Sequence, residues 1–480
     1  MVRNFARWTI GLLVLGLFFA TAKSWAADPV SPRPAASAQS TTTTASLPTQ
    51  FAYTGVGSCA STACHGGPAG SPLKWQSSYT VWATLDPHAK AYAVLASPRS
   101  KEIVQRLDGS DPPEPWKVAR CLACHSVQGA KATLELGMLA DGVSCEACHG
   151  PANHWLLEHT TAAWTKLAKS KRYEVPFGMR NTEDMLPRAQ QCVGCHIGEL
   201  DPSRGVLRDV NHDLIAAGHP RLTFELSAYM TNMPPHWDKS AGEKTKEEAR
   251  AWAVGQVVSA AADFALREAH SKSGGIEFAD YDCFACHHEL KTKSWRRTQF
   301  NARRGFATPG DLRLSTWYTG MLPRLESMSK VKLVPPPDLR SIVGTVNALE
   351  AWIQVQDAAA LRNTMAQIAR LGTDAVHWED ATQCYLALLA LENAHRDDLK
   401  SRASPPTKVD AEIRQSLDAI FQGLRYLKIC RDEDGNVTID PDCKPPATEV
   451  SRMDSPRDYD PEQFRAKLKK LAALLTNDRQ

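Results

Sequence analysis

Four copies of one short pattern, Cys-x-x-Cys-His, constrain this chain more than any other feature of its sequence. They run from Cys121 to His125, Cys145 to His149, Cys192 to His196 and Cys283 to His287. A longer form, Cys59-x4-Cys64-His65, precedes them. Zinc ribbons and thioredoxin-like redox sites also use paired cysteines, but neither needs a histidine directly after the second cysteine. Here that histidine follows every time.

Cys-x-x-Cys-His is the attachment site of a c-type haem, with two thioether bonds from the cysteines and the histidine bound to the iron. We therefore expect five covalently bound haem c groups. In the first motif the two extra residues must loop out, and a Cys59–Cys64 disulfide is the alternative. The expected attachment cysteines are Cys59, Cys64, Cys121, Cys124, Cys145, Cys148, Cys192, Cys195, Cys283 and Cys286, and the expected proximal iron ligands are His65, His125, His149, His196 and His287.

The N-terminus has the pattern of a secretory signal peptide. A basic start is followed by an apolar run over residues 8–20 and a small-residue cleavage site at Ser24-Trp25-Ala26. We expect cleavage after Ala26 and a periplasmic location, which suits covalent haem attachment; an uncleaved anchor is the alternative. The run is short for a membrane span, so none is expected in the mature chain. Residues 27–50, rich in Pro, Ser and Thr, read as a disordered linker.

The charge balance argues against a nucleic-acid partner. The whole chain has a formal charge of +3, and residues 1–26 contain three basic side chains and no acidic one. The mature chain is therefore formally neutral, without the basic excess that nucleic-acid binding requires.

Residues 51–310 are expected to form a haem domain. At roughly 50 residues per haem, the porphyrins must replace much of the usual aliphatic core. Helical patterns are expected at 86–96, 153–169 and 247–269, and no strand pattern is convincing. The fold class is thus mainly α, with a haem-filled core and little strand.

Ten further histidines can supply distal ligands, which close an iron site for electron transfer, whereas an open site can bind small molecules. His88 is the first candidate because it begins an expected helix between the first two motifs. His154 and His159 are five residues apart, so they do not serve one iron together. The other candidates are His212 and His219, then His236, His270 and His288, while His377 and His395 are expected in the surface or the core.

Several segments resemble a known family. The opening motif is followed by Trp82 and His88-Ala89-Lys90-Ala91, then by Gly-Val-Ser-Cys-Glu-Ala-Cys-His-Gly-Pro at 142–151 and by a fourth motif. In this order and spacing, residues 59–196 resemble the cytochrome c-554-type tetrahaem proteins, which accept electrons from hydroxylamine oxidation. The resemblance implies that His159 ligates the first haem, that His88 ligates the third, and that the haem on His125 has an open position.

This chain also departs from that family. Its first motif is longer, its fifth haem is extra, and the last third has no counterpart. The family's distal ligand for the fourth haem falls in a region that does not align. His212 or His219 is the candidate for that role.

Residues 311–480 contain no haem motif. After a linker at 331–338, amphipathic runs near 339–370, 377–396, 409–428 and 461–476 predict a small helical bundle. Cys430 and Cys443 flank an expected hairpin and are predicted to form a disulfide outside the cytoplasm. The acidic loop between them departs from the spacing of a calcium-binding loop, and Cys384 is expected to be a buried thiol.

These observations favour electron transfer between redox partner proteins. The histidines are ample for distal ligation, and no motif has a nearby cluster of Lys, Tyr and Arg. One alternative is an oxidoreductase acting on a small nitrogen or sulfur species at one open haem, so whether the chain is an enzyme stays open. Another is a subunit whose C-terminal helices dock it in a larger redox complex.

Overall fold

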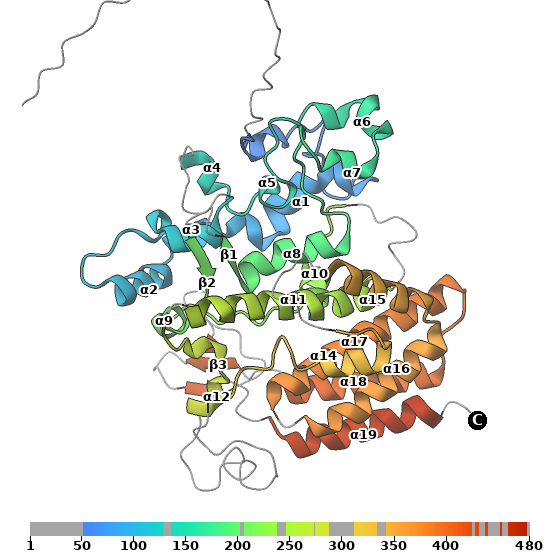
Figure 1. Cartoon of the computed structure of the whole chain (residues 1–480). Helices are drawn as coiled ribbons and strands as arrows, with labels where there is room; N and C mark the ends of the chain where they lie inside the picture. Colours follow the sequence, from blue (N-terminus) through green and yellow to red (C-terminus); the bar gives the residue numbers. More distant parts are fainter. Residues whose placement is uncertain are drawn as a thin grey trace, which may run out of the picture. The chain divides into compact units, whose positions relative to one another are not determined.

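We describe the fold from a computed structural model of the chain (Figure 1). The structure describes residues 51–127, 136–201, 206–237, 246–272, 274–287, 312–333, 342–375, 377–424, 428–431, 437–439, 452–453 and 459–477. The predicted signal peptide, the linker at 27–50 and the predicted domain boundary near 310 lie outside these residues. Within them, no helix is long and apolar enough to cross a membrane.

The first half of the chain consists of short helices joined by turns. Their bounds are α1 Ser78–Leu85, α2 Pro98–Asp108, α3 Ala119–His125, α4 Leu136–Ala140, α5 Cys145–His149, α6 Ala162–Lys166, α7 Lys169–Arg172, α8 Met185–His196, α9 His212–Ala217 and α10 Leu226–Asn232. Two short strands, β1 Gly198–Asp201 and β2 Val206–Asp209, pair antiparallel between α8 and α9.

The four short haem motifs each occupy about one helical turn. Helices α3, α5 and α8 end at the motif histidine, and α12 covers Cys283–Cys286. In a helix, side chains three and four positions apart share one face. The two cysteines and the histidine of each motif are therefore presented together by local structure alone.

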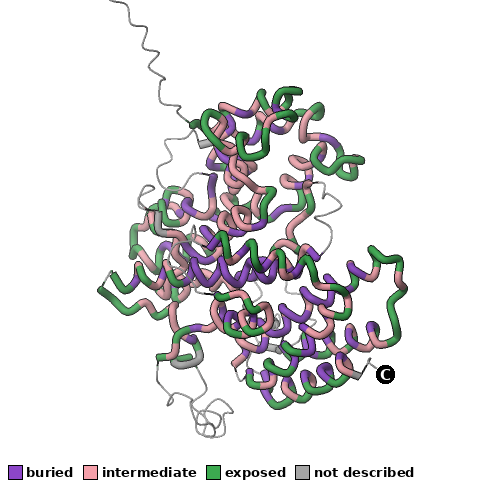
Figure 2. The backbone as a smooth tube through the Cα atoms, turned by 45° about the vertical axis from the view of Figure 1, so that its right-hand side comes forward, coloured by how far each residue is buried: buried purple, intermediate pink, exposed green. Residues whose placement is uncertain are grey.

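Helix α11, Glu247–Lys272, is the longest element and is buried on nearly every side along its first two thirds (Figure 2). It packs against α8 and α10 and also against α15 and α17. Small residues allow this close packing: a side chain at Gly255 would place its Cβ 2.6 Å from Leu226 Cβ. The expected helix at 247–269 is confirmed.

The predicted C-terminal helical bundle is also confirmed. Its helices are α14 Leu322–Ser329, α15 Val343–Val355, α16 Ala358–Leu371, α17 Trp378–Ser401, α18 Lys408–Leu424 and α19 Pro461–Asn477. Helix α16 packs on α17 and α19, and α18 packs on α19. One apolar core runs from α8 through α11 to α19, so α11 and the bundle share their interior.

Two of the expected helices are instead broken into short pieces. Residues 86–96 form two 3₁₀ turns, the first capped by the Asp86 side chain. Residues 153–169 break because the Thr161 side chain accepts a hydrogen bond from Trp164 N and starts a new helix. The expected hairpin is confirmed, since β3 Lys428–Arg431 pairs with β4 Val437–Ile439 and β5 Arg452–Met453. The side chain of Cys430 and all of Cys443 lie outside the described residues.

Candidate haem-binding site

A cavity of about 2010 Å³ lies among the first four motifs and is lined by their cysteines and histidines. Sites for one small molecule measure roughly 300–1,000 Å³, so this space suits several large ligands. In the described part of residues 51–180, buried apolar side chains form a small cluster on Ala152, Trp155 and Trp164, and others, such as Leu95 and Val104, line the cavity itself. The cavity therefore combines an apolar lining with the motif residues, which suits porphyrin rings.

The first motif accommodates its two extra residues in an exposed loop. Ser61 O accepts hydrogen bonds of 2.9 Å from both Cys64 N and Gly66 N. A Cβ on Gly66 would lie only 2.0 Å from Ala60 O. This tight return, which glycine alone permits, brings Cys64 and His65 back to the cavity wall, as the looped-out reading of the motif requires.

Four motif histidines each have a second imidazole at a separation that suits one iron atom. Two imidazoles bound on opposite sides of a metal, at about 2 Å each, have ring centres roughly 6 Å apart. The observed ring-centre separations are 6.1 Å for His65 and His159, 6.0 Å for His196 and His88, 6.4 Å for His125 and His219, and 6.4 Å for His287 and His212.

Two of these pairs differ from what the family resemblance implied. His88 lies beside His196 of the fourth motif rather than beside His149 of the third. His219 lies beside His125, so the position that the resemblance left open has an imidazole next to it. His159 does lie beside His65, as the resemblance implied.

Five of the eight rings in these pairs are oriented through their Nδ1 atoms, whereas His196 Nδ1 is buried without a hydrogen-bond partner among the described residues. His65, His125, His159 and His219 each have Nδ1 within 2.6–3.0 Å of a backbone carbonyl oxygen. His88 Nδ1 lies 2.9 Å from Asp86 Oδ1. Metal-bound histidines use this second contact to fix their tautomer and leave Nε2 for the metal.

His149 is the exception among the motif histidines. No imidazole of the described residues lies near it at the separation of the other four pairs. Burial is the main reason why the pKa of His149 falls to about 4. The nearby charges of His236, His65 and His159 lower it further. His236 Nδ1 lies 3.2 Å from Pro234 O. His65 and His159 lie beside each other, so His236 is the remaining candidate among the described residues to face this haem position.

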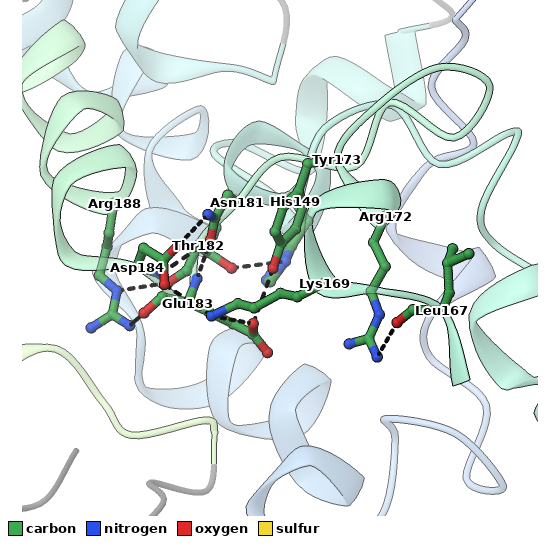
Figure 3. A network of polar contacts seen from close by, with 10 residues as sticks. All are labelled: His149, Leu167, Lys169, Arg172, Tyr173, Asn181, Thr182, Glu183, Asp184 and Arg188. Carbon is green, nitrogen blue, oxygen red and sulfur yellow. Dashed lines mark hydrogen bonds and ion pairs between the residues drawn. The ribbon is translucent and has the colours of Figure 1, made fainter. Parts of the chain in front are cut away.

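A polar network lies beside His149 (Figure 3). Thr182 Oγ1 is 3.4 Å from His149 Nδ1, and the neighbouring Glu183 bonds to Lys169 and Tyr173. Burial and the Glu183 charge raise the pKa of Tyr173 to about 12, so the phenol stays protonated at neutral pH. Because this network reaches His149 through Nδ1, it can orient the ring without competing for the Nε2 position.

The fifth motif has a site separate from the large cavity. Cys283 and Cys286 are exposed, and His212 reaches His287 from the first residue of α9. Asn211 caps that helix, and Glu277 accepts a hydrogen bond of 2.8 Å from His212 N. His219 follows the left-handed Gly218 at the other end of α9. One short segment therefore serves both the second and the fifth motifs.

The motifs lie close to one another. The thiols of Cys59 and Cys145, and those of Cys124 and Cys195, are close enough that Cys145 lowers the pKa of Cys59 and Cys195 raises the pKa of Cys124. Cys148 likewise contributes to the raised pKa of Cys192. Motifs one and three, three and four, and two and four are thus neighbours.

The remaining candidates lie elsewhere. Burial disfavours the charged form of His270, but hydrogen bonds to Asp209 and Asp280 outweigh it and raise the pKa to about 10. Both ring nitrogens are engaged at 3.0 Å, so this cation is unsuited to iron. His154 packs edge-on against Phe51. His377 pairs with Asp282 and His395 with Asp410. His288 lies outside the described residues.

Two residues of the site escaped the sequence analysis. Glu146, inside the third motif, has an exposed fraction of 1% and accepts hydrogen bonds from the backbone before the first motif. Arg221 donates to Cys283 Sγ at 2.9 Å. A charged residue between two attachment cysteines was a signal for Glu146, whereas nothing local distinguishes Arg221.

Comparison with known proteins gives one match. Residues 58–150 match the family described as cytochrome c554 and c-prime. This span covers the first three motifs and ends directly after the third, whereas the resemblance seen in the sequence extended to residue 196. No curated protein and no solved structure matches the chain. The match makes this segment similar to cytochrome c554 and c-prime and supports covalent haem attachment within residues 58–150.

Proposed function

Starting from this cytochrome c-554-like segment, we propose that the chain is a pentahaem relay that passes single electrons between redox partner proteins. The four imidazole pairs, 6.0–6.4 Å apart, carry the proposal. Haem iron held between two histidines changes oxidation state without offering a site to substrate. The chain's contribution is to orient five of the ligand rings through their Nδ1 contacts and to line the haem space with apolar side chains.

For the third motif, we propose His236 as the partner of His149. Their electrostatic interaction supports this assignment. Burial also lowers the pKa of His236, which keeps the ring in the neutral form that binds iron. All five irons would then have two histidine ligands.

The neighbouring motifs suggest an order for the relay. Sulfur contacts join motif one to three and motif two to four, and the thiols of three and four interact. Helix α9 carries one histidine for motif two and one for motif five. The proposed order is therefore one, three, four, two, five, with the first and fifth haems at the ends.

The intact mass of the purified protein tests the number of haems. We expect the mass of the mature chain plus five haem groups, and four or fewer would refute a pentahaem relay. Ferric EPR should then show low-spin signals alone, and the reduced protein should not bind carbon monoxide. N-terminal sequencing and cell fractionation test the further proposal that the chain is exported to the periplasm and begins at Ala27.

An oxidoreductase with one open haem is the second candidate, because among the described residues His149 has no imidazole at the separation found for the other four motifs. In that case one haem of the wild-type protein binds carbon monoxide, and His236→Ala leaves this fraction unchanged. In a relay, wild type binds none and His236→Ala creates one binding haem. His154→Ala is the matched control and should change neither result.

A further inference from the structure

The fifth motif is connected to the haem-free bundle by a chain of polar contacts. Arg221 Nη1 donates to Cys283 Sγ at 2.9 Å, and its Nη2 donates to Ser315 Oγ at 3.2 Å. The Ser315 hydroxyl in turn donates to Glu379 Oε2 at 3.0 Å. Glu379 lies in the first turn of α17. Two side chains, Arg221 and Ser315, thus link a haem-attachment sulfur to a carboxylate of the bundle.

A second set of contacts holds the same two regions together. Asp282, the residue before Cys283, pairs with His377 at 3.6 Å just before α17. Arg313 pairs with Asp380 at 3.7 Å, and Arg313 O accepts a hydrogen bond from Asp282 N. The start of α17 is therefore fixed against the fifth motif. Its charged side chains lie close enough to act on a haem bound there.

Glu379 is the titratable carboxylate at the bundle end of this network. Burial raises its pKa, opposed mainly by the nearby Arg221 charge, while Asp282 and Asp380 add to the rise. Thr316 N also donates to Oε2 at 3.2 Å, which favours the carboxylate. The other charged or titratable groups around it, from every neighbouring element, are Arg313 and Tyr318 in the 312–320 segment, Asp263 and Arg267 in α11, and His377 before α17.

We propose that Glu379 takes up a proton when the fifth haem is reduced, so that the bundle makes electron transfer at this haem proton-coupled. The inference rests on the proposed relay. One electron from the preceding haem reduces the iron, one proton from solvent binds the carboxylate, and the local charge is unchanged. Oxidation releases the proton again. The physical reason is that an added negative charge favours protonation of a nearby acid.

The reduction potential of the fifth haem, measured against pH, tests this proposal. A proton coupled to one electron lowers the potential by about 59 mV for each tenfold fall in proton concentration. We expect a slope approaching this value over part of the pH range above the ordinary pKa of a glutamate. In a redox titration of all the haems, the signal of the fifth haem is the one that disappears in a Cys283→Ala, Cys286→Ala variant, which lacks the attachment sulfurs of this haem.

Variants of Glu379 provide the decisive comparison. Glu379→Gln, which cannot ionise, should remove the slope and hold the potential near the low-pH value of the wild type. Glu379→Asp should restore a slope. Glu462→Gln is the matched control, because Glu462 also lies in the first turn of a helix, in α19, and should behave as wild type. A slope that persists in Glu379→Gln would overturn the proposal.

Direct proton counting covers the case in which Glu379→Gln loses the fifth haem. In weakly buffered solution, full reduction of the wild-type protein should take up protons. The Cys283→Ala, Cys286→Ala variant should take up fewer, because it lacks the uptake that accompanies reduction of the fifth haem. Equal uptake in the two proteins would refute the proposal. A wild-type mass with fewer than five haems would instead refute the relay itself, so the two failures are distinguishable.

Discussion

Glu146 offers the sharpest test of how the first and third motifs are held together. Its carboxylate accepts hydrogen bonds from Thr54 N at 2.9 Å, Gly55 N at 2.8 Å and Ala152 N at 2.8 Å. A glutamine in its place puts an amide NH₂ where one carboxylate oxygen was, and that group faces backbone N–H donors. At least one of these bonds must then become a donor–donor contact.

The size of the effect follows from the bond that is lost. A hydrogen bond to a charged group contributes about 1.5–3 kcal/mol. Losing one in Glu146→Gln should therefore weaken the attachment of the segment before Cys59 by that amount. Each 1.4 kcal/mol is a tenfold change in an equilibrium constant, so backbone opening of residues 52–58 should become roughly 10- to 100-fold more frequent.

Hydrogen–deuterium exchange measured by mass spectrometry reports this opening directly. We expect faster exchange in peptides that cover 52–58 and unchanged exchange in peptides from α16 and α17. Glu158→Gln is the matched control, because Glu158 lies on an exposed turn nearby. If Glu146→Gln keeps its full haem content and its 52–58 exchange stays within twofold of wild type, the carboxylate does not hold this segment and the reasoning is wrong.

Three further predictions follow from the same geometry. His219→Ala should open the sixth position of the haem on His125, seen as one new high-spin ferric signal and one haem that binds carbon monoxide; an unchanged spectrum would contradict the pairing. Gly66→Ala should force its Cβ against Ala60 O and lower the haem content, measured by intact mass, by one group. Gly70→Ala is the control: its Cβ position is open, so the variant should keep all its haems, although its positive φ strains the backbone there. Because the pKa of His270 is raised to about 10, its ion pairs stabilise the fold fully below the unfolded-state pKa near 6.5 and are lost as pH rises toward 10. The thermal midpoint should therefore fall more steeply between pH 7 and 10 in wild type than in His270→Gln, and parallel curves would argue against a charged His270.

What the sequence predicts well in this chain is local. Cysteines and the histidine within one helical turn meet through backbone geometry, so their roles can be read from spacing. Helix α11 and the bundle follow from long apolar periodicity. The broken turns at 86–96 and 153–169 were harder, because single side-chain caps at Asp86 and Thr161 decide them.

The pairing of histidines is not local, and there the sequence is a weak guide. His88 and His196 are more than a hundred residues apart, and their proximity depends on how the whole region packs. His236 has no local sequence signal that distinguishes it from the other candidate histidines. His270 lies at a helix end before the fifth motif, a position that suits an iron ligand. Asp280 and Asp209, from other elements, instead contact its two ring nitrogens.

The uneven distribution of apolar packing bears on what stabilises each half of the chain. The large apolar core of the described residues runs from α8 to α19, whereas buried apolar side chains around the first three motifs, such as Val104 and Leu122, lie outside it. The later half can therefore draw its stability from side-chain contacts of its own. Each porphyrin attached in the earlier half would add apolar surface there, so the stability of that half should depend on haem more strongly than the stability of the bundle.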